Sequence, residues 1–379
     1  MTGKNKININ IASLSDVHLN HPRTPTTHII KNLNTDFPDN AETGELDLIF
    51  IAGDLFDSPL PFYDNVVDEI QLWMLRLFRI CHVWNIALRV LEGTKSHDRG
   101  QSKRFDAVLE MANLDVDFKY VDTLSIEHME KLDIDILYVP DEWDVDTDKT
   151  WLAVQDLMAQ KQIKKVDFSV MHGQFEHQLE YAPHAPIHVA QRYLDITRFF
   201  IFIGHVHTMS IFERILAHGS YDRLAMNEEE DKGHFRVIVD TSDVTKSKIR
   251  FVVNKGAMRY NTYDISKMKN EDLEGYLTKK LEAIEESSYI RFVTTNDTFK
   301  LATIDSIIAA FPMHKYRMKK IKENGEVNKE TISVQVDAIP INDRTIIDLI
   351  KKRLEERDLA NDFKGGILSK LESVIKEVG

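Results

Sequence analysis

Six short apolar runs constrain the fold of this chain more than any other feature. They are INIASLSD, LDLIFIAGD, ALRVLEGT, DILYVPDE, DFSVMHG and FFIFIGH, and each is bounded by turn residues. Runs of this length predict buried strands, and the amphipathic stretches between them, such as VVDEIQLWMLRLFRICHVWN and WLAVQDLMAQKQ, predict helices. Strands that alternate with helices indicate a layered α/β fold with the sheet in the middle.

The pattern changes near residue 265. Two consecutive strands, FRVIVD and KIRFVVN, come before this point, and NEDLEGYLTKKLEAIEESS then predicts a helix with Asn270 as its N-cap. The segments YIRFVTT, ATIDSIIAAF and MHKYRMKKI predict a strand, a helix and a strand. We therefore expect a main domain over residues 1–265, a small α/β module over 266–340 and a tail of two amphipathic helices over 341–379.

Composition excludes some classes of protein. The 379 residues carry a net charge of −13, which argues against a general nucleic-acid binder but leaves a nuclease possible, because hydrolytic metal sites use acidic residues and histidines. The single cysteine, Cys81, cannot form an internal disulfide, so we expect a reducing compartment. The polar start MTGKNKININ predicts no signal peptide, and no apolar run is long enough to span a membrane.

Acidic residues and histidines gather directly after the predicted strands. In chain order these residues are Asp16 and His18, Asp54, the group Ser96, His97 and Asp98, His172, and finally His205 and His207. Loops at the carboxyl ends of strands in α/β sheets converge on one crevice. We therefore expect these side chains to meet in one site.

Such a set of ligands suits divalent transition metals. Imidazole with carboxylate favours manganese, iron or zinc over magnesium and calcium, which prefer oxygen ligands. Asp54 can bridge two ions, and a pair about 3.5–4 Å apart can clamp both oxygens of a phosphate displacement. Each motif alone has a simple structural explanation, since Gly-Asp is a common turn and Asp-x-His occurs by chance. Five motifs in this order, each at a strand end, indicate a metal site.

The same series resembles the calcineurin-like metallophosphoesterases. The segments GDLFD and GSYDRLAMNEEEDKGHF are similar to those of SbcD-type DNA repair nucleases, and the resemblance covers residues 7–260. It implies a layered β-sandwich core flanked by helices, a small α/β capping domain over residues 266–340 and a helical tail.

The resemblance also implies a role for each site residue. It assigns a first metal to Asp16, His18 and His207, a bridge to Asp54, a second metal to His172 and His205, the leaving-group proton to His97, and the orientation of His97 to Asp98. Manganese is the implied ion. Ser96 stands where the family has an Asn ligand, and its hydroxyl is shorter and a weaker donor. An inward shift of the backbone through the extension Thr94-Lys95, a bridging water and a degenerate loop are the alternatives.

The function implied by the resemblance is DNA phosphodiester hydrolysis in repair, recombination or replication. It includes 3′-to-5′ exonuclease and single-strand endonuclease activity in the cytoplasm of a bacterial or phage-infected cell. The implied partners are DNA, a second copy of the chain and an SbcC-type ATPase bound by the apolar stripe of residues 367–378, with no membrane. The alternatives are a small-substrate phosphodiesterase or phosphatase, and a non-catalytic scaffold for DNA ends or the ATPase.

Several polar segments leave two interpretations open. One segment contains Arg99, Lys103 and Arg104, which are expected either to contact phosphate or to lie on a solvated helix surface. Another is the basic strand near residues 314–322, which is expected either to face DNA or to form a protected sheet edge. Residues 174–196, which contain three histidines, predict a segment packed beside the site or facing the substrate. Residues 228–231 predict a solvated acidic turn.

Overall fold

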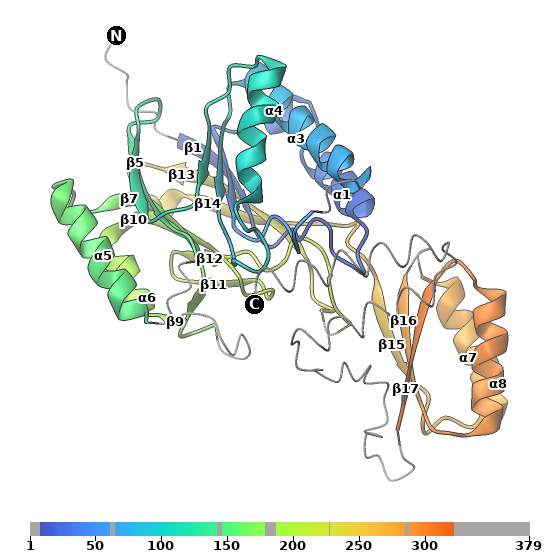
Figure 1. Ribbon diagram of the computed structural model, residues 1–379. Helices are drawn as coiled ribbons and strands as arrows, with labels where there is room; N and C mark the ends of the chain where they lie inside the picture. The colour runs from blue at the N-terminus through green and yellow to red at the C-terminus, as the bar shows by residue number, and fades with distance from the viewer. Residues whose placement is uncertain are drawn as a thin grey trace, which may run out of the picture.

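Two six-stranded sheets pack face to face in the computed structural model (Figure 1). The structure describes residues 8–60, 65–141, 146–178, 187–226, 228–284 and 288–321. Helices cover the outer face of each large sheet, which gives four layers in the order helix, sheet, sheet, helix. The layered α/β core predicted from the sequence is confirmed.

The first sheet has the strand order β14-β13-β1-β2-β3-β4. Strands β1 to β4 are parallel, whereas β13 pairs antiparallel with β1 and β14 pairs antiparallel with β13. The bounds are β1 Asn8–Leu14, β2 Leu48–Ala52, β3 Ala87–Leu91, β4 Phe118–Val121, β13 Gly233–Asp240 and β14 Lys248–Val253. Every residue of β2 and β3 is buried, as expected for strands covered on both faces.

The second sheet has the order β11-β12-β10-β7-β6-β5. Its bounds are β5 Ser125–Met129, β6 Ile134–Val139, β7 Val166–His172, β10 Thr197–Gly204, β11 Ser210–Phe212 and β12 Ile215–Ala217. A short parallel pair, β8 Gln174–Phe175 and β9 Ile187–His188, lies outside both large sheets. The short strands β4, β5, β11 and β12 at or near the sheet edges were not predicted, because their apolar runs are brief.

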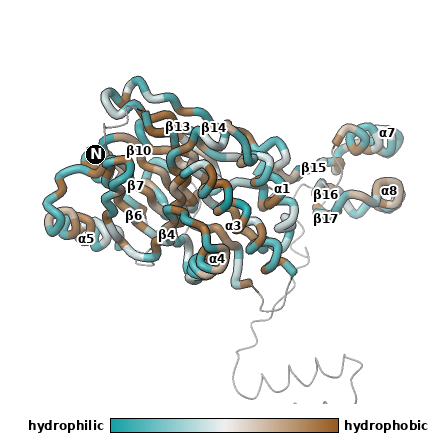
Figure 2. Tube along the Cα trace, turned by 90° about the horizontal axis from the view of Figure 1, so that it is seen from above, coloured by the Kyte–Doolittle hydropathy of each residue, from teal (hydrophilic) through white to brown (hydrophobic). Residues whose placement is uncertain are grey.

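Apolar side chains fill the space between the sheets. Phe50 of the first sheet packs against Phe202 of the second with ring centroids 5.4 Å apart. The first sheet is covered by α1 Thr26–Asp36, α3 Asn65–Trp84 and α4 Arg104–Ala112, and the second by α5 Thr147–Gln160 and α6 Ala190–Ile196. Three short helical segments are α2 Ala41–Gly44, η1 Gln101–Lys103 and η2 Val244–Lys246. Figure 2 shows the apolar residues gathered along the strands of both sheets.

A third, parallel sheet forms a separate small body beside the main layers (Figures 1 and 2). It contains β15 Tyr260–Asp264, β16 Tyr289–Thr294 and β17 Lys315–Lys320, and α7 Asn270–Glu282 and α8 Thr298–Ala310 share an apolar core with it. Lys269, not Asn270, occupies the N-cap position of α7. The boundary at residue 265 stays a prediction, and the tail over 341–379 lies outside the described residues.

Five strands end at one edge of the paired sheets and position the predicted site. The carboxyl ends of β1, β2 and β3 in one sheet lie beside those of β7 and β10 in the other, where Gly204 pairs with His172. The loop after β1 is tied to the loop after β2 by hydrogen bonds from the backbone nitrogens of Asp16 and His18. None of the helices in the described part of the chain has the length and hydrophobicity that crossing a lipid bilayer requires.

Candidate metal centre

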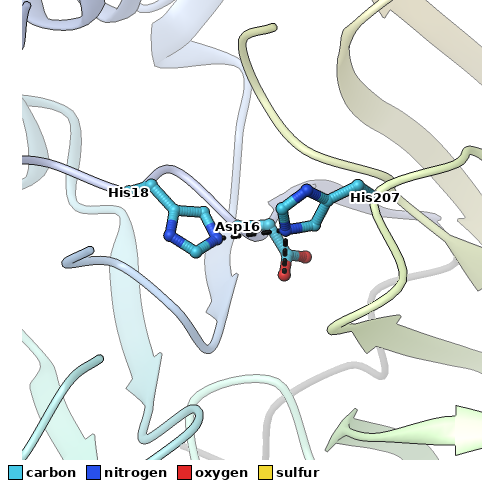
Figure 3. A group of neighbouring side chains, drawn as sticks. All are labelled: Asp16, His18 and His207. Carbon is cyan, nitrogen blue, oxygen red and sulfur yellow. Dashed lines mark hydrogen bonds and ion pairs between the residues drawn. The ribbon is translucent and has the colours of Figure 1, made fainter. Parts of the chain in front are cut away.

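Asp16, His18 and His207 point toward one another at the sheet edge (Figure 3). The Nε2 atoms of His18 and His207 are 3.2 Å apart, and Asp16 Oδ1 lies 3.9 Å from His207 Nε2. The Asp16 carboxylate is held in place by the backbone N–H of His205, which is 3.0 Å from each oxygen. Two imidazole nitrogens and a carboxylate that converge this closely are the ligands a divalent transition metal prefers.

Asp54, His172 and His205 form a second group beside the first. Asp54 Oδ2 lies 3.3 Å from His172 Nε2 and 3.9 Å from His18 Nε2, so one carboxylate oxygen faces both groups. The His172 ring is fixed because its Nδ1–H donates to the Ala52 carbonyl at 2.9 Å, which turns Nε2 toward Asp54. Asp54 is therefore shared by the two groups, and its role as a bridge between two ions stays a prediction.

The charges in the second group are coupled. Burial alone would raise the pKa of Asp54, but the charge of His172 and its hydrogen bond hold that pKa well below its usual range. Burial opposes charge on His172 as well, yet Asp54 raises the pKa of His172 to about 10. Burial lowers the pKa of His205 to about 4. A buried carboxylate stays ionised only beside a cation, and protonated His172 supplies that charge here. A metal ion held by the same atoms would replace this proton, so the residues present fit a metal ion.

The loops that carry these residues have an unusual backbone. Asp16, His18 and Asp54 have φ values of 50°, 51° and 50°, and His205 has a φ of 99°. Non-glycine residues rarely adopt this left-handed region, and such strain is concentrated at functional sites. Four of the seven residues predicted as metal ligands therefore lie in backbone conformations that the surrounding structure must hold in place.

Glu228 belongs to this centre, although the sequence predicted a solvated acidic turn there. Its Oε1 lies 3.1 Å from His207 Nδ1, and its Oε2 accepts hydrogen bonds from Ser220 Oγ and the Leu224 backbone nitrogen. The Lys232 ammonium, 3.1 Å away, neutralises the buried charge. Burial would raise the pKa of Glu228, but the hydrogen bond with His207 helps to lower it to about 2. The sequence has a Glu-x-x-x-Lys spacing here, but that spacing does not indicate that the pair is buried beside His207.

Asp57 contacts the rings of both His18 and His97. Its Oδ1 lies 3.2 Å from His18 Nδ1, and its carbonyl accepts a 2.5 Å hydrogen bond from His97 Nδ1. The sequence assigned the orientation of His97 to Asp98. In the structure Asp98 is fully buried and accepts from the backbone nitrogens of Phe56 and Gly93 at 2.9 and 2.7 Å, so it ties the loops after β2 and β3 together instead.

Thr94, rather than Ser96, lies among the residues of the second group. Thr94 Oγ1 is 3.2 Å from Asp54 Oδ2, 3.4 Å from His172 Nε2 and 3.3 Å from His205 Nδ1. Ser96 is exposed and lines an adjoining surface cleft with Lys95 and Arg99. Lys95 and Ser96 follow Thr94 and line that cleft, so Thr94 is the residue of this loop that reaches the second group.

The other polar segments lie near the centre or pack into the fold. Arg99 is exposed, and Lys103 forms an ion pair of 2.8 Å with Asp122. His188 is buried against Tyr193, with Nδ1 3.2 Å from the tyrosine oxygen, and His177 stacks on Phe212. His188 is therefore packed into the fold, while His184 lies outside the described residues.

Comparisons with known proteins give little further information. No protein-family profile matches the chain. No curated protein sequence matches it significantly. Among solved structures, one described only as a crystal structure is 12% identical, with a TM-score of 0.39, over 65% of this chain and 100% of its own. A second, the protein TT1561 of Thermus thermophilus, is 11% identical, with a TM-score of 0.35, over 64% of this chain and 98% of its own. Likenesses this weak carry no argument about activity.

Proposed function

We propose that the chain is a DNA phosphodiesterase that depends on two divalent metal ions, most favourably manganese. The observation that carries this proposal is the position of Asp54 Oδ2, which faces His18 of one ligand group and His172 of the other. A carboxylate oxygen shared by two groups of imidazole and carboxylate ligands is typical of sites that hold a pair of ions.

The residues divide between the two ions in a simple way. Asp16, His18 and His207 would hold the first, His172 and His205 would hold the second, and Asp54 would be shared. Ions bound there would supply positive charge that neutralises a phosphodiester and lowers the pKa of a water. The protein side chains fix the positions of these charges, because Ala52, Asp57 and Glu228 each hold one imidazole ring through a hydrogen bond or ion pair.

His97 would give the leaving group its proton. Its Nδ1–H donates to the Asp57 carbonyl, so Nε2 is the nitrogen left to exchange a proton with a substrate. The ring packs edge-on against His18 with centroids 4.9 Å apart, which places it directly beside the first ligand group. A histidine held in this way can donate a proton to the departing 3′ oxygen of a cleaved strand.

The small parallel sheet supports a DNA substrate over a small phosphoester. It contacts the loop that follows His18, where Tyr289 donates to the Arg23 carbonyl at 2.6 Å and Tyr260 lies 3.2 Å from Thr24. Its edge strand β17 carries four cationic side chains, and Lys315 and Arg317 are exposed. A row of exposed cationic side chains suits a long polyanion. We also propose that the chain acts with an SbcC-type ATPase that binds its C-terminal tail. The reason is that an acidic chain has little affinity of its own for DNA.

A cleavage assay tests this function. The purified chain with manganese is offered labelled duplex DNA, single-stranded DNA and a chromogenic phosphomonoester, beside His97→Ala and the exposed control His128→Ala. We expect DNA cleavage that falls about 10²- to 10⁴-fold in His97→Ala and is unchanged in His128→Ala. Cleavage of the monoester alone would support a small-substrate phosphatase instead, and metal binding without any cleavage would support a scaffold.

A further inference from the structure

We infer that the Thr94 hydroxyl is the fourth protein ligand of the ion held by Asp54, His172 and His205, and that this ion binds second and more weakly. The inference rests on the proposed two-ion site. It concerns a threonine, which is neither one of the predicted ligands nor an acidic residue or histidine. Ser96 is the residue at the position where the resemblance implies a metal ligand. It lines the surface cleft that also contains Lys95 and Arg99.

The surroundings of Thr94 Oγ1 favour a cation. Its three polar neighbours, Asp54 Oδ2, His172 Nε2 and His205 Nδ1, lie 3.2–3.4 Å away. The carboxylate oxygen is acceptor-only, and each ring nitrogen can turn a lone pair toward the same point. A hydroxyl can donate its one proton to only one of these three neighbours, and its oxygen lone pairs can face an ion bound between the carboxylate and the two ring nitrogens. This is the arrangement of donors around a four-coordinate or larger metal site.

The backbone compensates for the short reach of the threonine side chain. The Thr94 backbone nitrogen donates to Asp54 Oδ1 at 2.6 Å, so the chain passes against the bridging carboxylate itself. Gly93 permits this approach, because a side chain there would collide with the backbone nitrogen of Asp54. Because the backbone lies this close to Asp54, the short threonine side chain can reach the ion without the length of an asparagine.

The charges explain why this ion binds second. The first ligand group contains two carboxylates, Asp16 and the shared Asp54. The second group contains one carboxylate, the shared Asp54. Affinity for a divalent ion rises with the number of anionic ligands, and an alcohol oxygen is a neutral, weak donor. A titration of the metal-free chain should therefore show two steps, with Thr94 contributing to the weaker one.

The test is a titration of the full chain with Mn²⁺ after its bound metal has been removed with a chelator. Binding is measured as the decrease of the electron paramagnetic resonance signal of free Mn²⁺. We expect Thr94→Val to raise the dissociation constant of the weaker step about 10- to 100-fold and to leave the tighter step unchanged. Thr94→Ser should behave like the wild type, and so should Ser96→Ala, the control at the neighbouring hydroxyl. Thermal unfolding of each metal-free variant shows whether the fold is retained.

A cysteine substitution separates a ligand from a residue that only orients Asp54. A thiolate prefers a soft ion, so Thr94→Cys should bind Cd²⁺ more tightly relative to Mn²⁺ and show sulfur-to-cadmium absorption in the ultraviolet, while Ser96→Cys should not. The native Cys81 does not interfere, because it is buried and burial raises the pKa of its thiol to about 12.

Each outcome bears on one proposal or on both. An unchanged weaker step in Thr94→Val, or a cadmium signal in Ser96→Cys alone, overturns the assignment of Thr94 and leaves the two-ion function standing. A wild-type chain that binds no ion overturns both. Two steps, with the weaker one lost in Thr94→Val and a cadmium signal in Thr94→Cys, support the assignment.

Discussion

At the scale of single residues, three imidazole rings of the candidate metal centre are oriented by hydrogen-bond acceptors on the side of the ring that faces away from the centre. These acceptors are not themselves predicted ligands. His172 donates to the Ala52 carbonyl and His97 to the Asp57 carbonyl, while the Glu228 carboxylate faces His207. Each contact selects which ring nitrogen faces the centre. Replacing one of these acceptors should therefore change metal affinity without removing a ligand.

Glu228→Gln tests this for His207. The amide loses the negative charge that favours a proton on His207 Nδ1, so we expect the tighter manganese step to weaken about 10- to 100-fold. Lys232 keeps Glu230 and the His207 carbonyl as partners, so the fold should persist. Calorimetric titration measures the affinity, and nitrogen chemical shifts of His207 report its tautomer. Glu229→Gln, an exposed neighbour, is the control, and equal affinities in both variants would contradict the role of Glu228.

The sequence predicted which side chains meet but not how they are held. The ligand candidates follow strands, and strand ends converge by topology, so Asp16, Asp54 and His207 could be placed in advance. Glu228 and Thr94 could not, because their positions depend on turns whose path is set by tertiary contacts. A buried carboxylate such as Glu228 also requires the partner Lys232, which sequence composition alone does not pair with it.

At the scale of elements, the loops after β2 and β3 form one unit. Asp98 accepts hydrogen bonds from both loops, and Thr94 donates to Asp54 across them. The strands and helices that support these loops were predicted well, because their apolar periodicity is long and regular. The N-cap of α7 at Lys269 and the short strands near the sheet edges were not predicted, because few residues specify them.

Gly93→Ala tests the close contact between these loops. The added methyl group would meet the backbone of Asp54, so the loop after β3 must move away and Thr94 must leave the second ligand group. We expect loss of the weaker manganese step and a free energy of unfolding lowered by about 1–3 kcal/mol, measured with urea. Gly275→Ala in α7 is the matched control, since its methyl group meets nothing and should stabilise the helix by about 0.5–1 kcal/mol. An unaffected metal titration in Gly93→Ala would contradict the contact.

At the scale of the whole molecule, the two large sheets are joined by buried polar contacts as well as by their apolar core. His218 follows β12 in the second sheet, and its Nε2 lies 2.7 Å from Ser13 Oγ of β1 in the first. Its Nδ1–H donates to the Ile203 carbonyl at 2.9 Å. The neutral ring is therefore fully satisfied, and burial lowers the pKa of His218 to about 4.

This histidine should make the fold sensitive to acid. Because its pKa in the folded chain lies below the usual 6.5, its contribution to stability is complete above pH 6.5 and is lost as the pH falls toward 4. One such group lowers the free energy of unfolding by about 1.4 kcal/mol per pH unit in that window. Urea unfolding with a chelator, at about pH 7 and pH 5, should show a smaller loss in His218→Gln than in the wild type. Equal losses would show that His218 is already charged or exposed.

The central claim is that two metal ions share Asp54, and anomalous diffraction from a manganese-soaked crystal tests it most directly. We expect two anomalous peaks about 3.5–4 Å apart. One should lie against Asp16, His18 and His207, the other against His172, His205 and Thr94, and Asp54 should contact both. A single peak, or two peaks of which only one contacts Asp54, would contradict the account.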